Sequence, residues 1–526
     1  MTRHQSFDPP ASSHAVVIGA GLGGLAAAMR LGARGWRVTV LDRLDIPGGR
    51  ATSITSHGHR FDLGPTIVTA PEVFRKLFAD CGRDFDSAVT LRALDPFYTI
   101  RWPDGSHLDA RAKDADMEAE IARLSPGDVD GWRKFLDDAE RRYVVGYEGM
   151  LTKPMHKLWE TLRVLPEFAM LRADRSILGL ARKRVKDERL RMALSFHPLF
   201  IGGDPSRVTS MYALVSHLEK TQGVHYAMGG VGAMAQAMAD VVTQQGGTLR
   251  LGTQVDCVSQ DETGRVNGVV LSGGETVAAD IVVSNADAGH TYSHLMRKQR
   301  RKRWTQAKLN RTRWSMGLFV WYFGTKGTRG MWPDLGHHTI QSGPRYEGLL
   351  RDIFRRGHLA EDMSLYIHRP SLTDPTVAPR GDDTFYALSP VPHLGHRSPI
   401  NWAQEAERYR QKVQDQLERT VMPGLGQHIS ASMCLTPEDF RDRYLSLHGA
   451  GFSVEPRILQ SAWFRPHNVS EEVPGLFLVG AGTHPGAGLP GVVASAEVLE
   501  QVVPPVGART PDSVAITTGS PAQAAE

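Results

Sequence analysis

Near the N-terminus, short β-branched apolar runs alternate with a longer stretch that has helical spacing. The run "AVVI", residues 15–18, is typical of a buried parallel strand, and "LAAAMRLGARG", residues 25–35, is typical of a helix that ends at Gly35. The next run, "WRVTVLD", predicts a second strand that ends at Asp42. A strand–helix–strand unit of this kind predicts an α/β fold with a parallel sheet covered by helices.

The turn that joins the first strand to the helix is rich in glycine. Gly19, Gly21 and Gly24 form a G-x-G-x-x-G pattern, and Gly23 lies within it. The first glycine permits the tight turn, the second lets the backbone approach a pyrophosphate, and the third lets helix and strand pack closely. Asp42, about twenty residues further on, can accept hydrogen bonds from ribose hydroxyls, and its charge disfavours a 2′-phosphate. The sequence therefore predicts a dinucleotide site, and one that does not favour NADP.

A second glycine pair follows the second strand and favours FAD over NAD. The segment "DIPGGRATS", residues 45–53, places Gly49 and Arg50 directly after that strand. A plain NAD domain has no need of this pair, whereas a larger cofactor folded along the sheet edge requires the chain to pass close to it. Arg50 can balance pyrophosphate charge, although an arginine after a turn can also lie at the surface without such a role.

A third glycine-rich segment lies near the C-terminus. In "LFLVGAGTHPGAGLPGVV", residues 476–493, an apolar strand leads into Gly480 and Gly482, and a helix follows. The N-terminus of that helix can stabilise negative charge on the pyrimidine ring of a reduced flavin. Residues 246–287 predict further strands and a hairpin between the two ends, and the backbone of Val255 is suited to pair with adenine. We therefore expect the two ends of the chain to meet around one FAD.

The chain resembles the bacterial and fungal phytoene desaturases. These are flavoproteins of the glutathione-reductase type, in its amine-oxidase-like branch. The resemblance spans roughly residues 15–500. It rests on the segments "VIGAGLGGLAAAMRL", "PGGRA", "FDLGPT", "LSFHPLFIGGDP", "VVSNADAGHTY", "ALSPVPHLG", "FRDRYLS", "GFSVEPRILQSAWFRPHN" and "LVGAGTHPGAGLPGV". The first three are shared by many flavoproteins, and the last two are far more specific. Many other flavoproteins have an acidic residue at the position of Ala481. The desaturases that the chain resembles have a neutral residue there.

The resemblance and the strand pattern together predict a Rossmann-like FAD-binding domain with an inserted α+β region. The predicted FAD-binding domain is discontinuous and comprises residues 15–80, 224–291 and 453–503. Residues 81–223 and 292–452 form the predicted substrate-binding and membrane-associating region. Residues 1–14 and 504–526 are predicted to be disordered tails.

Within the predicted insertion, one apolar stretch is read in two ways. Its sequence is "WSMGLFVWYFGT", residues 314–325. We expect either a core strand or the wall of a long apolar pocket, and both can hold because alternate residues of a strand face opposite sides.

The resemblance implies FAD-dependent, successive desaturation of 15-cis-phytoene and partly desaturated carotenes to neurosporene or lycopene. Oxygen or a membrane quinone would then reoxidise the flavin. Related carotenoid-modifying flavoenzymes remain alternatives: hydroxycarotenoid dehydrogenases, carotene isomerases and carotenoid oxygenases. A non-enzymatic escort protein that carries isoprenoid tails is a further alternative on the same fold, and it would lack a complete flavin site.

Three residues are candidates for acid–base catalysis. Glu160 and Arg163 are three residues apart on a predicted helix, where they form either an exposed ion pair or an acid–base pair at the mouth of an apolar pocket. His484 lies in the loop nearest the expected flavin, where it is either catalytic or a hydrogen-bonding group of the loop. The pair His337 and His338 has no third ligand nearby in the sequence, so no metal is predicted.

Charge and composition limit the partners and the location. The net charge is only +4, which does not indicate a nucleic-acid binder. The three cysteines are far apart, as in a reducing compartment, and the first residues lack the apolar core of a signal peptide. Two basic clusters, residues 180–192 and 297–304, are either solvated helix faces or sites that dock on anionic lipid. We expect a peripheral protein on the cytoplasmic side of the cell membrane, and the sequence is compatible with an oligomer.

Overall fold

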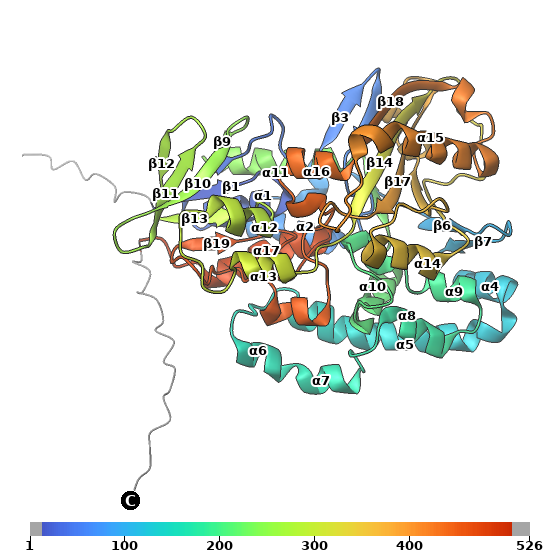
Figure 1. Ribbon diagram of the computed structural model, residues 1–526, viewed down its shortest axis with the longest axis horizontal. Helices are drawn as coiled ribbons and strands as arrows, with labels where there is room; N and C mark the ends of the chain where they lie inside the picture. The colour runs from blue at the N-terminus through green and yellow to red at the C-terminus, as the bar shows by residue number, and fades with distance from the viewer. Residues whose placement is uncertain (1–12, 508–526) are drawn as a thin grey trace, which may run out of the picture.

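The computed structural model describes residues 13–507. Two sheets dominate the architecture: a parallel sheet at one end of the molecule and a larger, mostly antiparallel sheet at the other (Figure 1). Most of each predicted tail, residues 1–12 and 508–526, lies outside the described residues. His14, which was assigned to the first tail, is instead the first residue of β1, where its ring bonds the Ala278 carbonyl and the Thr39 hydroxyl.

The parallel sheet is assembled from three distant parts of the chain. Its strands, in spatial order, are β19 (Leu476–Leu478), β13 (Ile281–Ser284), β1 (His14–Ile18), β2 (Arg37–Leu41) and β9 (Thr248–Arg250). All four strand pairings are parallel. The predicted first strand, helix and second strand are confirmed as β1, α1 (Leu22–Ala33) and β2, and Gly35 adopts a positive φ of 86° just after the helix.

Both faces of this sheet are covered by other elements, and apolar residues fill most of the buried positions of its strands. On one face, Val17 and Val283 pack against four helices: α1, α2 (Pro71–Asp80), α11 (Val231–Gln244) and α17 (Leu489–Val502). On the other face, Val16 and Val282 pack against a three-stranded meander of β10 (Val255–Gln260), β11 (Val266–Leu271) and β12 (Thr276–Ala278). The short helices α12 (Ala288–His290) and α13 (Gln306–Arg311) follow on that side.

The second sheet has seven strands and forms the other end of the molecule (Figure 1). In spatial order they are β18 (Ile429–Leu435), β14 (Gly317–Thr325), β17 (Asp383–Val391), β16 (Leu365–His368), β15 (His338–Gln341), β6 (Tyr98–Arg101) and β7 (His107–Ala110). Only β15 and β6 pair in parallel. Two short antiparallel pairs complete the strands: β3 (Ser53–Ser56) with β4 (His59–Asp62), and β5 (Leu91–Ala93) with β8 (His225–Ala227).

Both readings of the apolar stretch at residues 314–325 are confirmed, because every residue of β14 is buried and its two faces have different neighbours. Phe319, Trp321 and Phe323 pack into the core beneath α15 (Trp402–Thr420). Leu318, Val320 and Tyr322 face the opposite way and line the large cavity described below. The strand therefore closes a core on one side and forms a cavity wall on the other.

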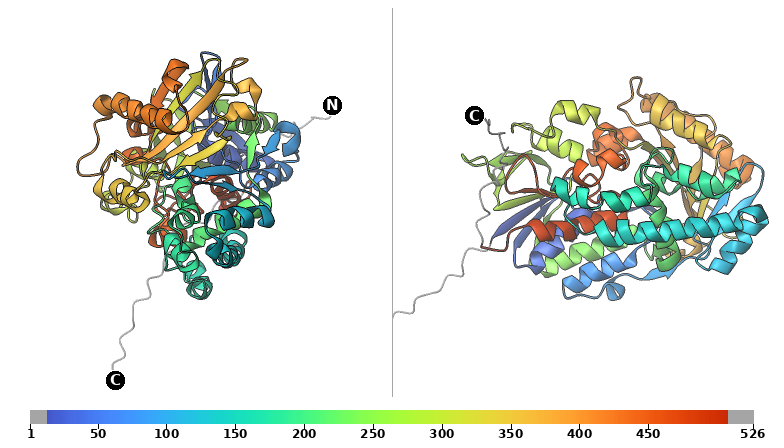
Figure 2. Two further views of the ribbon diagram at one scale, coloured as in Figure 1. Left: turned by 90° about the vertical axis from the view of Figure 1, so that its right-hand side faces the viewer. Right: turned by 90° about the horizontal axis from the view of Figure 1, so that it is seen from below.

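Helices cover the underside of the molecule, where the long helix α5 (Val129–Tyr143) crosses from one end toward the other (Figure 2, right). The remaining helices are α3 (Phe85–Ala88), α4 (Asp114–Leu124), α6 (Leu158–Arg163), α7 (Leu165–Met170), α8 (Ile177–Arg184), α9 (Glu188–Ala193), α10 (Leu214–Gln222), α14 (Tyr346–Arg351) and α16 (Pro437–Tyr444). Across residues 13–507, none of the helices combines the length and the apolar character needed to cross a bilayer.

The predicted domain boundaries stay a prediction, and one segment shows why they are hard to draw. The hairpin β3–β4 lies within the predicted FAD-binding segment 15–80, yet β4 packs on β17 of the second sheet. His59 of β4 bonds the hydroxyls of Thr384 and Ser430, both in the second sheet. The two parts of the molecule are therefore joined by buried polar contacts.

Candidate functional site

The first glycine turn has the geometry that a dinucleotide requires. Gly19 has a φ of 97°, and its N–H donates to the Leu41 carbonyl over 2.7 Å, which fixes the turn against β2. A side chain at Gly24 would place its Cβ 2.0 Å from the Gly19 carbonyl oxygen. The turn therefore tolerates only glycine at these positions, and the backbone between them stays open to a ligand.

The two ends of the chain meet at this turn, as the sequence predicts. A Cβ on Gly23 would lie 3.0 Å from the Gly480 Cα and 2.6 Å from Asn285 Oδ1. Asn285 follows β13, and its amide also donates to the Gly19 carbonyl over 3.4 Å. Asn285 thus joins both glycine turns; sequence reasoning missed it, although the motif "VVSNAD" carries it directly after a predicted strand.

Asp42 immediately follows β2, lies in the same site and is buried. Its Oδ2 accepts the Ala20 N–H over 2.6 Å, and its Oδ1 accepts the Leu44 N–H over 2.8 Å. Burial raises the pKa of Asp42, while these two backbone hydrogen bonds oppose that rise. Each carboxylate oxygen keeps a further lone pair for a ribose hydroxyl, so the predicted role remains geometrically open.

The second glycine pair packs directly on the first turn. Gly48 and Gly49 have φ values of 111° and 58°, and a Cβ on Gly49 would lie 3.3 Å from the Gly21 Cα. Arg50 follows and lines the same cavity, with its guanidinium donating to Ser446 Oγ over 3.0 Å. Asp287 also lines the cavity, and the buried atoms Arg50 Nε and Asp287 Oδ2 have no hydrogen-bond partner. Such orphaned polar atoms fit a polar ligand like FAD.

The C-terminal loop is held in place by a buried arginine that sequence reasoning quoted but gave no role. Arg465 donates to the carbonyl oxygens of Ala481 (2.7 Å) and Thr483 (3.0 Å), on either side of Gly482. Burial lowers the pKa of Arg465 to about 10, so the side chain stays charged at neutral pH. Gly480 has a φ of 93° and donates its N–H to Ser495 Oγ in α17, which ties the loop to the helix.

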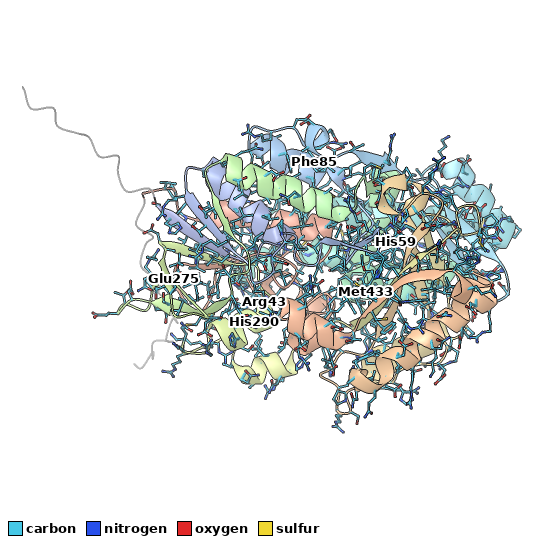
Figure 3. The ribbon with its side chains drawn as sticks, turned by 90° about the horizontal axis from the view of Figure 1, so that it is seen from above. Arg43, His59, Phe85, Glu275, His290 and Met433 are labelled. Atoms are coloured by element: carbon cyan, nitrogen blue, oxygen red, sulfur yellow. The ribbon has the colours of Figure 1, made fainter. Side chains whose placement is uncertain are left out.

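One large cavity connects this glycine-lined site to apolar surfaces of the second part of the molecule. Its volume is about 790 Å³, and the predicted cofactor residues in its wall include Gly19, Gly21, Gly23, Asp42, Gly49, Arg50, Val255 and Gly482. Arg43 and His290 also line it, and Figure 3 shows them close together near the middle of the molecule. The rest of the wall is mostly apolar and includes Leu162, Phe168, Leu214, Leu318 and Val320.

His484 lies in the wall of this cavity and is buried. Its Nε2 lies 3.0 Å from the Lys153 carbonyl oxygen, to which it donates as a neutral ring, and its buried Nδ1 has no partner. Burial lowers the pKa of His484 to about 4. The ring is therefore neutral at physiological pH and has a free lone pair.

Glu160 and Arg163 lie on α6, near the apolar end of the cavity, but they do not contact each other. Glu160 caps its own helix, because its Oε2 accepts the Lys157 N–H over 2.8 Å. The Arg163 guanidinium stacks on the Trp159 ring at 3.9 Å. The sequence predicts that Glu160 and Arg163 share one face of a helix. That they act together as an acid–base pair on the substrate stays a hypothesis.

Comparisons with known proteins agree with this geometry. The family model for flavin-containing amine oxidoreductases matches residues 22–497. A curated protein of Cereibacter sphaeroides, named phytoene desaturase (neurosporene-forming), is 66% identical over 94% of this chain and 96% of its own. A protein of the same name from Rhodobacter capsulatus is 63% identical over 93% of this chain and 94% of its own.

More distant relatives extend the same pattern. A Paracoccus protein named phytoene desaturase (lycopene-forming) is 42% identical over 94% of this chain and 98% of its own. Among solved structures, an oxidoreductase from Methanosarcina mazei superposes with a TM-score of 0.62 at 17% identity, covering 93% of this chain and 100% of that one. That structural likeness concerns the fold.

Proposed function

The chain belongs to the flavin-containing amine oxidoreductases, and from that premise we propose that it is an FAD-dependent phytoene desaturase, an oxidoreductase that acts on CH–CH groups. The cofactor predicted from the glycine turns is confirmed by the family. The observation that carries the proposal is the single cavity, because it joins the glycine-lined site to an apolar wall.

The residues of the glycine-lined site divide the binding of FAD among them. The turn at Gly19–Gly24 and the α1 N-terminus would hold the pyrophosphate, Asp42 would accept hydrogen bonds from a ribose, and Arg50 would supply a compensating charge. Bound FAD supplies the two-electron acceptor for desaturation. The α17 N-terminus lies in the cavity wall, beside the loop that Arg465 fixes, and its positive helix end would stabilise negative charge on a bound flavin.

A linear carotene offers no polar group, so the chain must bind it by shape and by burial of apolar surface. The wall formed by β14, α6, α7 and α10 provides that surface. Burial of apolar area contributes roughly 25 cal/mol per Å², which suffices for a long hydrocarbon. The same wall excludes water from the carbon atoms that lose hydrogen.

We further propose that His484 accepts the proton released when a double bond forms. Its Nδ1 is free, buried and in the cavity wall, and Nε2 is fixed by the Lys153 carbonyl. A carbon next to a developing allylic cation is strongly acidic, so a weak base suffices. A pKa near 4 then keeps the ring unprotonated and ready at every physiological pH.

Two relatives above 60% identity are named neurosporene-forming, whereas a relative at 42% identity is named lycopene-forming. All three names describe a phytoene desaturase. On this basis the proposed main product of this chain is neurosporene, formed by three successive desaturations of phytoene.

Membrane attachment is part of the proposal, because the substrate dissolves in lipid. Exposed apolar side chains gather on α6 and α7 and on the loop that follows Glu455: Leu162 is 51% exposed, Met170 77% and Leu459 69%. Leu162 and Leu459 also line the cavity. An apolar surface at a cavity mouth allows a carotene to pass from the bilayer without entering water.

The two basic clusters contribute less to membrane binding than their numbers of Lys and Arg residues predict, because acidic residues of the protein pair with several of them. In residues 297–304, Arg297 is paired with Asp256, while Arg303 stacks on Trp463 and lies 3.5 Å from Glu471. In residues 180–192, acids of the protein also neutralise cations: Arg184 pairs with Asp138 and Arg189 with Asp187. The proposed contact is therefore the α6–α7 surface, on the cytoplasmic side of the membrane, with exposed Lys153, Lys157 and Arg163 facing the headgroups.

The function is tested by mixing the purified protein, FAD and 15-cis-phytoene in liposomes and separating the pigments by chromatography. We expect neurosporene as the main product, and parallel runs with oxygen or with a quinone under argon identify the electron acceptor. If phytoene is recovered unchanged although FAD is bound, a related carotenoid substrate is indicated. A protein that takes up no FAD would instead support the escort alternative.

A further inference from the structure

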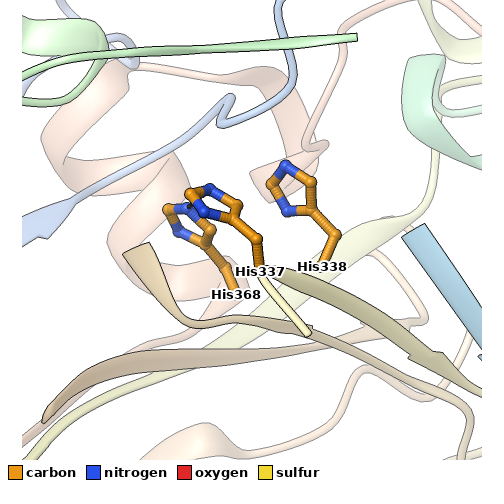
Figure 4. Close-up of side chains that lie close together, drawn as sticks. All are labelled: His337, His338 and His368. Carbon is orange, nitrogen blue, oxygen red and sulfur yellow. Dashed lines mark hydrogen bonds between the residues drawn. The ribbon is translucent and has the colours of Figure 1, made fainter. Parts of the chain in front are cut away.

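A second polar cluster lies outside the proposed active site, in the seven-stranded sheet. It consists of His337, His338 and His368, and Figure 4 shows their rings gathered on one side of the strands. His338 in β15 and His368 in β16 are direct cross-strand partners, and His337 immediately precedes β15. The Arg369 N–H donates to the His337 carbonyl over 2.8 Å, which continues the pairing past the strand end. All three rings are buried.

In two of these rings, one nitrogen contacts a protein hydroxyl on the outside of the cluster. His337 Nδ1 lies 2.6 Å from Thr373 Oγ1, and His338 Nδ1 lies 2.7 Å from the Tyr366 hydroxyl. The opposite nitrogens point inward: Nε2 of His337 and Nε2 of His368 are 3.1 Å apart. An imidazole that binds a metal through one nitrogen commonly bonds a protein group through the other.

We propose that His337, His338 and His368 form a binding site for one divalent transition-metal ion of the zinc type. Their candidate ligand atoms all lie within 4.8 Å of one another. In a tetrahedral site with Zn–N bonds of about 2.0 Å, ligand nitrogens are separated by about 3.3 Å. The pair at 3.1 Å already has this spacing, and the third candidate ligand atom lies within 4.8 Å of both.

One buried polar atom without a partner points to a ligand at this place. His338 Nε2 has no hydrogen-bond partner, although the ring is buried. A buried polar atom that is left unpaired destabilises the fold. A metal ion bound to this nitrogen would satisfy it directly.

All three candidate ligands are imidazoles, and their rings are buried away from solvent. A ligand set of three imidazoles, without thiolate or carboxylate, favours zinc and its neighbours over magnesium or calcium.

The cluster also reaches the cavity wall through one shared hydroxyl. The Tyr366 hydroxyl lies 2.7 Å from Thr66 Oγ1 as well as from His338 Nδ1, and both Tyr366 and Thr66 line the cavity. With a metal on Nε2, the His338 Nδ1–H donates to Tyr366, and the Tyr366 hydroxyl then donates to Thr66. The proposed ion therefore has a structural role: it fixes the orientation of a tyrosine in the substrate wall.

The first test is the metal content of the purified, FAD-loaded protein, compared with two variants. His368→Gln removes one ligand. His59→Gln is the matched control, because His59 is also a buried strand histidine bonded to two hydroxyls, but in β4 and outside the cluster. We expect about one zinc per chain in the wild type and in His59→Gln, and below about a fifth of that in His368→Gln.

Thermal unfolding with and without a chelator gives a second readout. The chelator should lower the Tm of the wild type and of His59→Gln, and should leave that of His368→Gln unchanged. X-ray absorption at the zinc edge of the wild type should report three imidazole nitrogens at about 2.0–2.1 Å, and it remains informative if His368→Gln does not fold. Zinc content that is unaffected by His368→Gln, a wild type that stays metal-free after incubation with zinc, or an oxygen-only coordination shell would each overturn the proposal.

Discussion

Gly23 in α1 and Gly480, two residues after β19, lie so close together that a side chain on Gly23 would not fit, although 457 positions separate them in the chain. A Cβ on Gly23 would lie 3.0 Å from the Gly480 Cα, which is closer than carbon atoms normally approach. Asn285 fills the remaining side of the contact. The glycine-lined site is therefore closed by the close approach of segments that meet only in the folded state.

This contact leads to a first prediction, Gly23→Ala. The added methyl group must displace Asn285 or separate the two glycine turns, a form of overpacking that costs about 1–3 kcal/mol. We expect the flavin absorbance per chain to fall below about a tenth of the wild-type value, because each tenfold loss of affinity needs only about 1.4 kcal/mol. Gly127→Ala is the control, since a Cβ there meets no atom within 4 Å. A soluble Gly23→Ala variant with full flavin content would contradict the prediction.

The Glu160 carboxylate caps α6, and this contact predicts the effect of Glu160→Gln. The glutamine carbonyl can still accept the Lys157 N–H, so the cap is retained while the charge is lost. We expect desaturation to stay within about twofold and stability within about 0.5 kcal/mol. A fall of about 10²-fold in turnover at normal FAD content would instead support the acid–base role with Arg163 at the substrate mouth.

His484→Gln is predicted to behave differently. Glutamine can keep the donor to the Lys153 carbonyl, but it has no basic nitrogen in place of Nδ1. Turnover should fall by about 10²-fold or more while FAD content is retained. In the wild type, the neutral ring is the active form, so the rate should not depend on this group above pH 6 and should fall only as the pH approaches its pKa of about 4. Unchanged turnover in the variant would exclude His484 as the proton acceptor.

Glu455 makes stability depend on pH. It is buried near Asp204, Arg207 and Arg457, and burial raises its pKa to about 7 from a usual value near 4.5. The folded state favours the protonated form of Glu455, so this residue does not lower the free energy of unfolding below pH 4.5. The free energy of unfolding then falls as the pH rises from about 4.5 through about 7. The full loss is about 3 kcal/mol.

Glu455→Gln should therefore stabilise the protein at pH 8 relative to the wild type, with little difference at pH 5. Thermal unfolding at the two pH values measures this change. Glu262→Gln, at an exposed position, is the control and should show no pH-dependent difference. A variant that is equally or less stable than the wild type at pH 8 would show that the charged carboxylate is well accommodated.

The sequence predicted those parts of the fold and site that depend on local backbone chemistry. The turn at Gly19–Gly24, the strand that ends at Asp42 and the two-sided strand at residues 317–325 all follow from spacing and from side-chain shape. Local patterns also suggested that the two ends of the chain meet, because both carry a glycine turn. These features need no knowledge of distant contacts.

Features created by distant contacts were not predictable. His368 joins His337 and His338 only because β16 pairs with β15, and no pattern in the sequence reports that pairing. Arg465 was visible in a specific motif, yet its role comes from the carbonyl groups of a loop that follows β19. The charge clusters were visible too, but their neutralisation by Asp138, Glu471 and other acids depends on the folded state.

The last prediction separates an apolar from an electrostatic membrane contact. Leu162→Glu combined with Met170→Glu introduces two charges on the exposed α6–α7 surface. Burial of a large apolar side chain contributes about 1.5–3 kcal/mol, so the double variant should bind anionic liposomes at least about 100-fold more weakly in sedimentation assays. Arg300→Glu, in the basic cluster, should weaken binding by about fivefold to tenfold, because one cation near the surface contributes about 1 kcal/mol. High salt should reproduce only the smaller effect, since screening acts on charge and not on buried apolar area. If salt and Arg300→Glu abolish binding while the double variant binds normally, the protein attaches through its basic residues, and the α6–α7 surface has another role.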